Sequence, residues 1–118
     1  TIIEGVAREV FEETTADVEV GPLALIYEFP PHKQSGDYDE NAKHGLHLIF
    51  ECTLKNGSIP KLPEYPDPNQ TAVKWIPIEK LDSILLLPNI IQQIKNYIDN
   101  RRNIELIEDY RLDKLYLK

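Results

Sequence analysis

The sequence predicts a mixed α/β fold in a single domain over residues 1–118. Apolar residues recur at helical spacing in residues 1–14 and again in residues 88–100, whereas residues 18–29 and 46–54 are rich in branched and aromatic residues. The chain has 118 residues, of which 42% are hydrophobic. This length suits one modest hydrophobic core and is too short for two domains.

The first element is expected to be a helix over residues 1–14. Its opposite face carries three acids, Glu9, Glu12 and Glu13, with Arg8 as the nearby cation. The apolar stripe recurs at the three-and-four spacing of a helix with one buried face and consists of Ile3, Val6, Ala7, Val10 and Phe11.

Two strands are expected next, separated by a polar loop. Residues 18–31 (VEVGPLALIYEFPP) predict a strand after a bend at Gly21-Pro22, ended by Pro30-Pro31, and residues 31–45 have the polar composition of a long loop. Residues 46–54 predict a second strand. Its core face is expected to consist of Leu46, Leu48, Phe50, Cys52 and Leu54, and its mixed face of His47, Ile49, Glu51 and Thr53.

The second half of the chain is expected to finish the domain. Residues 59–70 (IPKLPEYPDPNQ) hold four prolines and predict an extended loop, residues 71–78 (TAVKWIPI) predict a third strand, and residues 78–85 a short helix. A better helix is expected from Pro88 to about Asn100. Residues 103–118 alternate charges with apolar residues without a clean period, which suits an extra strand, a docked tail or a dimer arm.

Composition restricts the classes of partner. The chain has 13 basic and 20 acidic residues and a net charge of -7, which disfavours nucleic-acid polymers and anionic membranes unless a cation intervenes. Cys52 is the single cysteine, which suits a reducing compartment, and no segment is apolar enough for a membrane span or signal peptide. We therefore expect a cytoplasmic protein, and one that needs a metal if it handles phosphates.

The acidic face of the first helix is unfavourable on local grounds. Glu9 and Glu13 form a like-charge pair four residues apart, which costs about a few tenths of a kcal/mol. All three acids lie toward the C-terminal end, where the helix dipole disfavours each by roughly 0.3–1 kcal/mol. Arg8 relieves Glu12 alone. A divalent cation such as Mg²⁺ or Mn²⁺ would reverse the balance, since it prefers hard oxygen ligands; a solvated acidic face is the simpler alternative.

Residues 8–13 resemble the box of the Nudix (MutT-like) family, which reads G-x5-E-x7-R-E-U-x-E-E-x-G-U, where U is bulky and aliphatic. Arg8, Glu9, Val10, Glu12 and Glu13 fit R-E-U-x-E-E position for position, with Phe11 at the free site. Residues 73–81 (VKWIPIEKL) and the helix after Pro88 are similar to the strand and helix with which the family finishes. The resemblance covers most of the chain to about residue 100.

Two departures accompany the resemblance. Thr15 stands where the family has glycine and Ala16 where it has a bulky aliphatic, so the turn that ends the helix is expected to be built differently. The first Gly and Glu of the box would fall before Thr1. The family's fold is an α/β/α sandwich around a mixed sheet whose first strands precede this helix. We therefore expect the natural protein to be longer by several tens of residues.

The resemblance implies Mg²⁺- or Mn²⁺-dependent hydrolysis of a diphosphate linkage in a nucleoside diphosphate joined to another group. It implies Glu9, Glu12 and Glu13 as metal ligands, with Glu9 also able to orient water, and Arg8 as the residue that holds the carboxylates in place. The partner is then a small nucleotide derivative. Dimers are common in the family, so a homodimer is compatible with the chain.

A further carboxylate is expected from outside the helix, as ligand or general base. Glu51 is the first candidate because it lies on the less apolar strand face with His47, and Glu64 and Asp67 are candidates because a proline-rich loop can present them. Each alone is also compatible with ordinary solvation. Gln70 can bind a ligand but cannot act as a base. The three histidines lack the spacing of a zinc set, and Tyr27, Phe29 and Trp75 are expected in the core, with base stacking as the alternative.

Two other functions compete with the hydrolase. A catalytically silent Nudix-like domain that binds a nucleotide or acts as a scaffold is favoured by Thr15 and Ala16 and disfavoured by the intact acids. A structural α/β protein with a coincidental motif requires five matches in register by chance.

Overall fold

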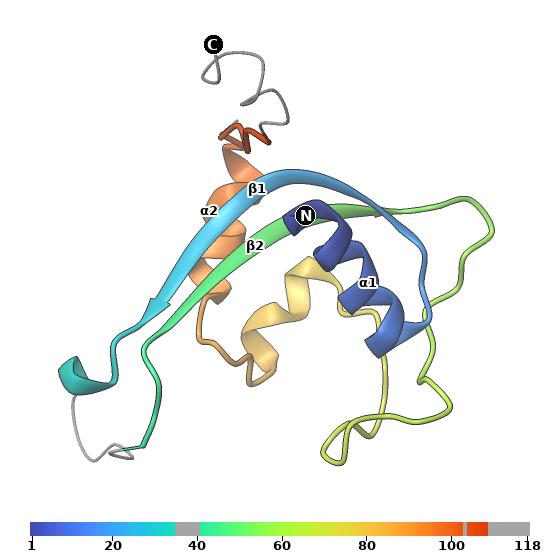
Figure 1. Ribbon diagram of the computed structural model, residues 1–118, viewed down its shortest axis with the longest axis horizontal. Helices are drawn as coiled ribbons and strands as arrows, with labels where there is room; N and C mark the ends of the chain where they lie inside the picture. The colour runs from blue at the N-terminus through green and yellow to red at the C-terminus, as the bar shows by residue number, and fades with distance from the viewer. Residues whose placement is uncertain (35–40, 103, 109–118) are drawn as a thin grey trace, which may run out of the picture.

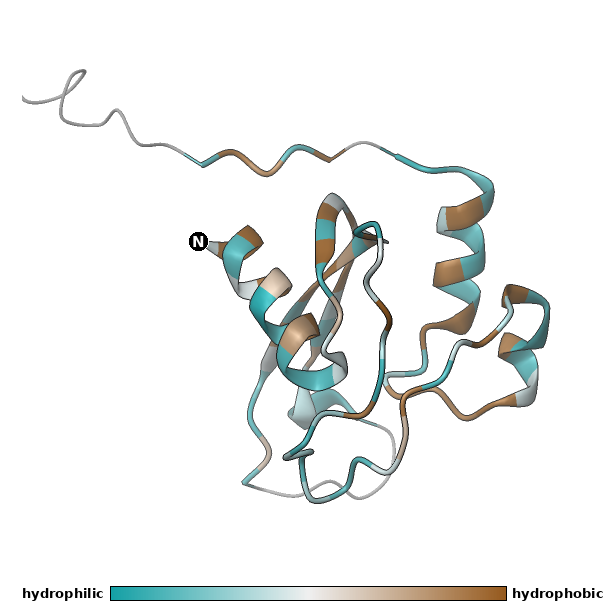
Figure 2. Ribbon diagram, turned by 90° about the vertical axis from the view of Figure 1, so that its right-hand side faces the viewer, coloured by the Kyte–Doolittle hydropathy of each residue, from teal (hydrophilic) through white to brown (hydrophobic). Residues whose placement is uncertain are grey.

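The computed structural model describes residues 1–34, 41–102 and 104–108. Its elements, in chain order, are α1 (Ile2–Thr14), β1 (Val18–Phe29), the 3₁₀ helix η1 (Pro31–Lys33), β2 (Gly45–Leu54), the 3₁₀ helix η2 (Ile78–Ser83) and α2 (Ile91–Asp99). The two long strands pair antiparallel, and α1 and α2 lie on opposite sides of this strand pair (Figures 1 and 2). The expected mixture of helices and strands is confirmed.

Helix α1 forms where the sequence predicts it because both of its ends are capped. The Thr1 hydroxyl accepts a hydrogen bond from the Glu4 N–H at 3.2 Å, and the Glu4 carboxylate accepts one from the Thr1 nitrogen at 3.2 Å. This reciprocal arrangement is a capping box, which satisfies N–H groups that have no helical partner. At the other end, the Thr15 N–H donates to the Phe11 carbonyl at 2.8 Å and closes the last turn.

Strand β1 absorbs the expected bend as a bulge and continues past it. Relative to β2, it carries one extra residue between Val20 and Leu23 and another between Leu23 and Leu25. A Cβ atom on Gly21 would lie 2.7 Å from a backbone oxygen of β2, so the close approach of the two strands requires glycine there. The neighbouring Pro22 fits because a bulge interrupts the ladder of hydrogen bonds.

The prediction of a third strand over residues 71–78 is wrong. These residues run without strand pairing until η2 begins at Ile78. Branched and aromatic residues favour extended backbone, but a strand also needs a neighbour to accept its hydrogen bonds. Helix α2 begins at Ile91, three residues later than expected, because the Ile90 N–H bonds the Pro88 carbonyl at 2.9 Å in a turn. Its expected end near Asn100 is confirmed.

The apolar interior is more open than the sequence predicts. Among the described residues, the buried hydrophobic side chains are Ala16 (2% exposed) and Leu23 (7%), and most others are half-buried. Leu46 and Trp75, both expected in the core, are 68% and 75% exposed. Leu46 lies opposite Glu28 near the start of β2, and Trp75 belongs to the unpaired extended segment. No helix in the described ranges has the length and apolar character that crossing a membrane requires.

Candidate functional site

The acidic face of α1 forms one wall of a cleft. Glu9, Glu12 and Glu13 face a segment of the proline-rich loop across a space of about 520 Å³. The loop contributes Pro63, Glu64, Tyr65, Asp67 and Gln70. The structure thus brings together the three helix acids, both loop acids and the glutamine that the sequence singled out separately.

The loop is held against the C-terminal end of α1 by hydrogen bonds to two carbonyls. The Gln70 amide donates from Nε2 to the Glu13 carbonyl at 2.7 Å, and the Lys61 N–H donates to the Thr14 carbonyl at 2.8 Å. Carbonyls in the last turn of a helix have no partner within the helix, so these bonds satisfy acceptors that the fold leaves free. They also position the second wall of the cleft relative to the first.

Helix α1 ends in a left-handed turn although glycine is absent. Thr15 adopts φ 58° and ψ 6°, so the expectation of a differently built turn is wrong. Threonine takes this conformation at a cost of roughly 1–2 kcal/mol, and its Oγ1 is buried without a hydrogen-bond partner in the described structure. Ala16 is the most buried apolar residue, and its N–H donates to the Thr14 hydroxyl at 3.2 Å. Both departures from the motif therefore preserve the end of the helix.

The acids of the cleft are exposed and carry little compensating charge. Arg8 Nε lies 3.6 Å from Glu12 Oε1, and these side chains are 67% and 61% exposed. This is a loose ion pair and is too long for a hydrogen bond. In the described structure no hydrogen bond or ion pair joins the Glu9 or Glu13 carboxylate to another residue. With two further carboxylates on the loop, the cleft attracts cations and repels bare anions.

The charged side chains of the cleft are of the type that a hard divalent cation prefers as ligands. All of them are carboxylates, which are the ligands that Mg²⁺ and Mn²⁺ prefer. Within the described ranges, however, no three His, Cys, Asp or Glu side chains converge as in a preformed metal site. The acids share one cleft as exposed side chains.

Glu51 lies outside the cleft, contrary to its expected role as a catalytic carboxylate. Arg101, just after α2, donates from Nε to Glu51 Oε1 at 2.7 Å and from Nη1 to the Ile98 carbonyl at 3.1 Å. The hydrogen bond that Arg101 donates to the Glu51 carboxylate raises the pKa of Arg101. Alternation along a strand identified the face of Glu51, but the position of α2 decided its partner.

The histidines also find local partners. His44 Nε2 lies 2.7 Å from Glu28 Oε2, which joins the loop before β2 to the end of β1. His47 packs edge-on against Tyr27 with ring centroids 5.5 Å apart, and His32 lies 5.9 Å from His44 between ring centroids. These contacts lie near the end of β1 and the beginning of β2.

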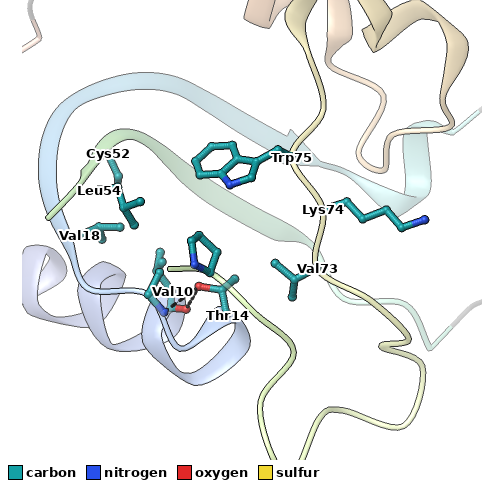
Figure 3. A pocket seen from close by; sticks show the side chains of 10 residues that line it. Val10, Thr14, Val18, Cys52, Leu54, Val73, Lys74 and Trp75 are labelled. Atoms are coloured by element: carbon teal, nitrogen blue, oxygen red, sulfur yellow. Dashed lines mark hydrogen bonds between the residues drawn. The ribbon is translucent and has the colours of Figure 1, made fainter. Parts of the chain in front are cut away.

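A second, apolar hollow lies on the other side of α1. It has a volume of about 280 Å³ and is lined mainly by the apolar side chains of α1, both strands and the extended segment with Trp75 (Figure 3). The Trp75 ring projects over it toward Cys52 and Leu54, whereas Lys74 points away. Partial burial raises the pKa of the Cys52 thiol. The hollow has the composition of a packing surface, so α1 separates an apolar side from a charged one.

Tyr65 is the aromatic member of the cleft, and sequence reasoning missed it. It is 88% exposed and lines the same space as the helix acids. The neighbouring sequence could have predicted its exposure. Tyr65 lies between Pro63 and Pro66 in a segment without apolar periodicity, so it belongs to no face that could pack in the core.

The chain has no significant match to any protein-family model, curated protein or solved structure. The resemblance of residues 8–13 to the Nudix box therefore remains an expectation from the sequence motif.

Proposed function

We propose that the protein is a metal-dependent hydrolase of the Nudix type that cleaves a diphosphate linkage in a nucleoside diphosphate derivative. One observation carries the proposal: the three acids of the R-E-U-x-E-E motif form one wall of a cleft whose other wall adds two carboxylates. An acidic cleft of this kind suits a phosphate substrate only when cations accompany it.

The resemblance and the positions of the side chains support the following roles. Glu9, Glu12 and Glu13 would hold Mg²⁺ or Mn²⁺, and Arg8 would restrain Glu12 through their ion pair. The metal would supply neutralisation of phosphate charge and a more acidic water. Glu64 and Asp67 replace Glu51 as candidates for the general base, because they lie in the cleft and Glu51 does not.

The reaction is a hydrolysis at phosphorus. Water attacks one phosphorus atom of the anhydride, the bond from that atom to the bridging oxygen breaks, and the second phosphate leaves with the bridging oxygen. The carboxylate of Glu64 or Asp67 takes the proton of the attacking water. The products are two phosphate monoesters.

The experiment compares metal binding and turnover in matched variants. Thermal unfolding with and without Mg²⁺ or Mn²⁺ is measured for the wild type, Glu13→Gln and Glu19→Gln, and hydrolysis is followed on a panel of nucleoside diphosphate derivatives. Glu13 is the sharpest choice because its carboxylate has no partner in the described structure to lose. Glu19 is an exposed strand acid opposite Thr53, outside the cleft, and controls for the loss of one charge.

We expect the metal to raise the unfolding temperature of the wild type and of Glu19→Gln but not of Glu13→Gln, because a ligand that binds only the folded state stabilises it. Metal-dependent hydrolysis should be lost in Glu13→Gln alone. An equal metal response in all three proteins would remove the site. Nucleotide binding without turnover in the wild type would instead identify a silent binding domain.

A further inference from the structure

We propose that Tyr65 stacks on a planar base of the substrate, so that the cleft selects derivatives with an aromatic base over base-free diphosphates. This inference rests on the proposed function and assigns the residue that recognises the base of the substrate. It starts from the composition of the cleft, in which one aromatic ring accompanies five carboxylates.

The exposure of Tyr65 shows that its ring serves no packing role in the described structure. At 88% it is more exposed than Trp75 and Phe11, which are 75% and 51% exposed. Trp75 covers the apolar hollow and Phe11 lies on α1, whereas Tyr65 alone of the three lines the acidic cleft. An aromatic ring in water gains free energy when a flat apolar surface covers it.

The loop presents the ring with little freedom. Pro63 and Pro66 flank Tyr65 and restrict the backbone on both sides. The loop is tied to α1 before and after the ring, by the N–H of Lys61 and the side chain of Gln70. Since ordering a flexible loop opposes binding, a loop that is already tied loses less entropy when a ligand arrives.

The cleft accommodates the two ends of such a ligand. Its volume of about 520 Å³ falls within the range of roughly 300–1,000 Å³ of small-molecule sites. Phosphate groups and their cations belong at the α1 wall, which carries three of the five acids, and the base belongs at the Tyr65 wall. Stacking uses the face of the base, so it accepts any base and rejects a ligand that has none.

The experiment measures binding of ADP and of inorganic pyrophosphate by calorimetry in the presence of Mg²⁺. The variants are Tyr65→Ala, Tyr65→Phe and Tyr65→Leu, of which the last keeps apolar bulk without an aromatic face. Ile59→Ala is the control, because Ile59 is a 75% exposed apolar residue of the same loop outside the cleft. Circular dichroism checks that each variant is folded.

We expect Tyr65→Ala and Tyr65→Leu to weaken ADP binding about tenfold or more, since base stacking on an aromatic ring has effects of this size. Pyrophosphate binding should be unchanged, and Tyr65→Phe and Ile59→Ala should match the wild type. Equal ADP binding by Tyr65→Leu and wild type, or equal weakening of both ligands in Tyr65→Ala, would overturn the stacking role and leave the proposed function standing. A wild type that binds neither ligand would overturn both.

Discussion

Replacing Thr15 by glycine should stabilise the protein, although most core and helix-end substitutions destabilise. Thr15 has φ 58°, a conformation that costs a residue with a Cβ roughly 1–2 kcal/mol. Glycine removes that cost but adds freedom to the unfolded chain worth about 0.4–1 kcal/mol. It also removes a buried hydroxyl without a partner, which costs about 1–3 kcal/mol, at the loss of a half-buried methyl worth roughly 0.8 kcal/mol. Together these contributions give a net gain of about 2 kcal/mol, within a range of roughly 0.2–3.8 kcal/mol.

Urea unfolding of the wild type and three variants separates these contributions. Thr15→Ala removes the hydroxyl but keeps the Cβ, so it should gain less than Thr15→Gly. Thr14→Gly is the matched control: its hydroxyl donates to the Val10 carbonyl at 2.7 Å, and glycine in that last helical turn should cost about 1 kcal/mol. A gain of 1 kcal/mol corresponds to a rise in unfolding temperature of about 4–8 °C. Thr15→Gly no more stable than Thr15→Ala would refute the left-handed assignment.

Three other outcomes follow from the packing. Gly21→Ala should destabilise the protein by about 1–3 kcal/mol, because the added Cβ would meet a backbone oxygen at 2.7 Å. Gly5→Ala, which places a Cβ in open space on a helix, should stabilise the protein by about 0.5–1 kcal/mol. Urea unfolding that ranks the two variants the other way would contradict the strand register. Gln70→Ala should cost about 1 kcal/mol through the lost bond to α1, while the exposed Asn69→Ala should cost less than about 0.5 kcal/mol. Because burial raises the pKa of the Cys52 thiol, the unfolded chain loses the thiol proton first as the pH rises past about 8.5, and the free energy of unfolding should fall there. Cys52→Ser should lack that fall. A fall of the same size in both proteins would show that other groups cause it.

Local patterns predicted the elements whose stability is local. Helix α1 combines an apolar stripe with a capping box, and β2 has an alternating pattern between turn residues, so both appear close to their expected bounds. The Gly21-Pro22 pair was read correctly as a disturbance of β1. Composition alone could not tell a break from a bulge, because that depends on how closely β2 approaches.

The wrong predictions concern residues whose environment depends on distant segments. Residues 71–78 have strand composition, but composition does not supply a pairing partner. The same limit applies to Leu46, Trp75 and Glu51: periodicity assigns a side chain to a face, and only the packing of other elements decides whether that face is covered or charged. The position of Tyr65 in the cleft likewise depends on two hydrogen bonds between segments far apart in the sequence.

Side-chain carboxylates give the cleft its charge, whereas backbone carbonyl oxygens anchor its second wall. The loop is anchored on the carbonyl oxygens of Glu13 and Thr14, which every amino acid possesses. Exchange of the Glu13 side chain therefore changes what the cleft attracts and leaves its second wall anchored. One anchor, the N–H of Lys61, is also independent of side chains, whereas the other requires the amide of Gln70. Substitutions at position 13 thus change the charge of the cleft and keep both anchors, whereas a substitution at position 70 removes one of the two anchors.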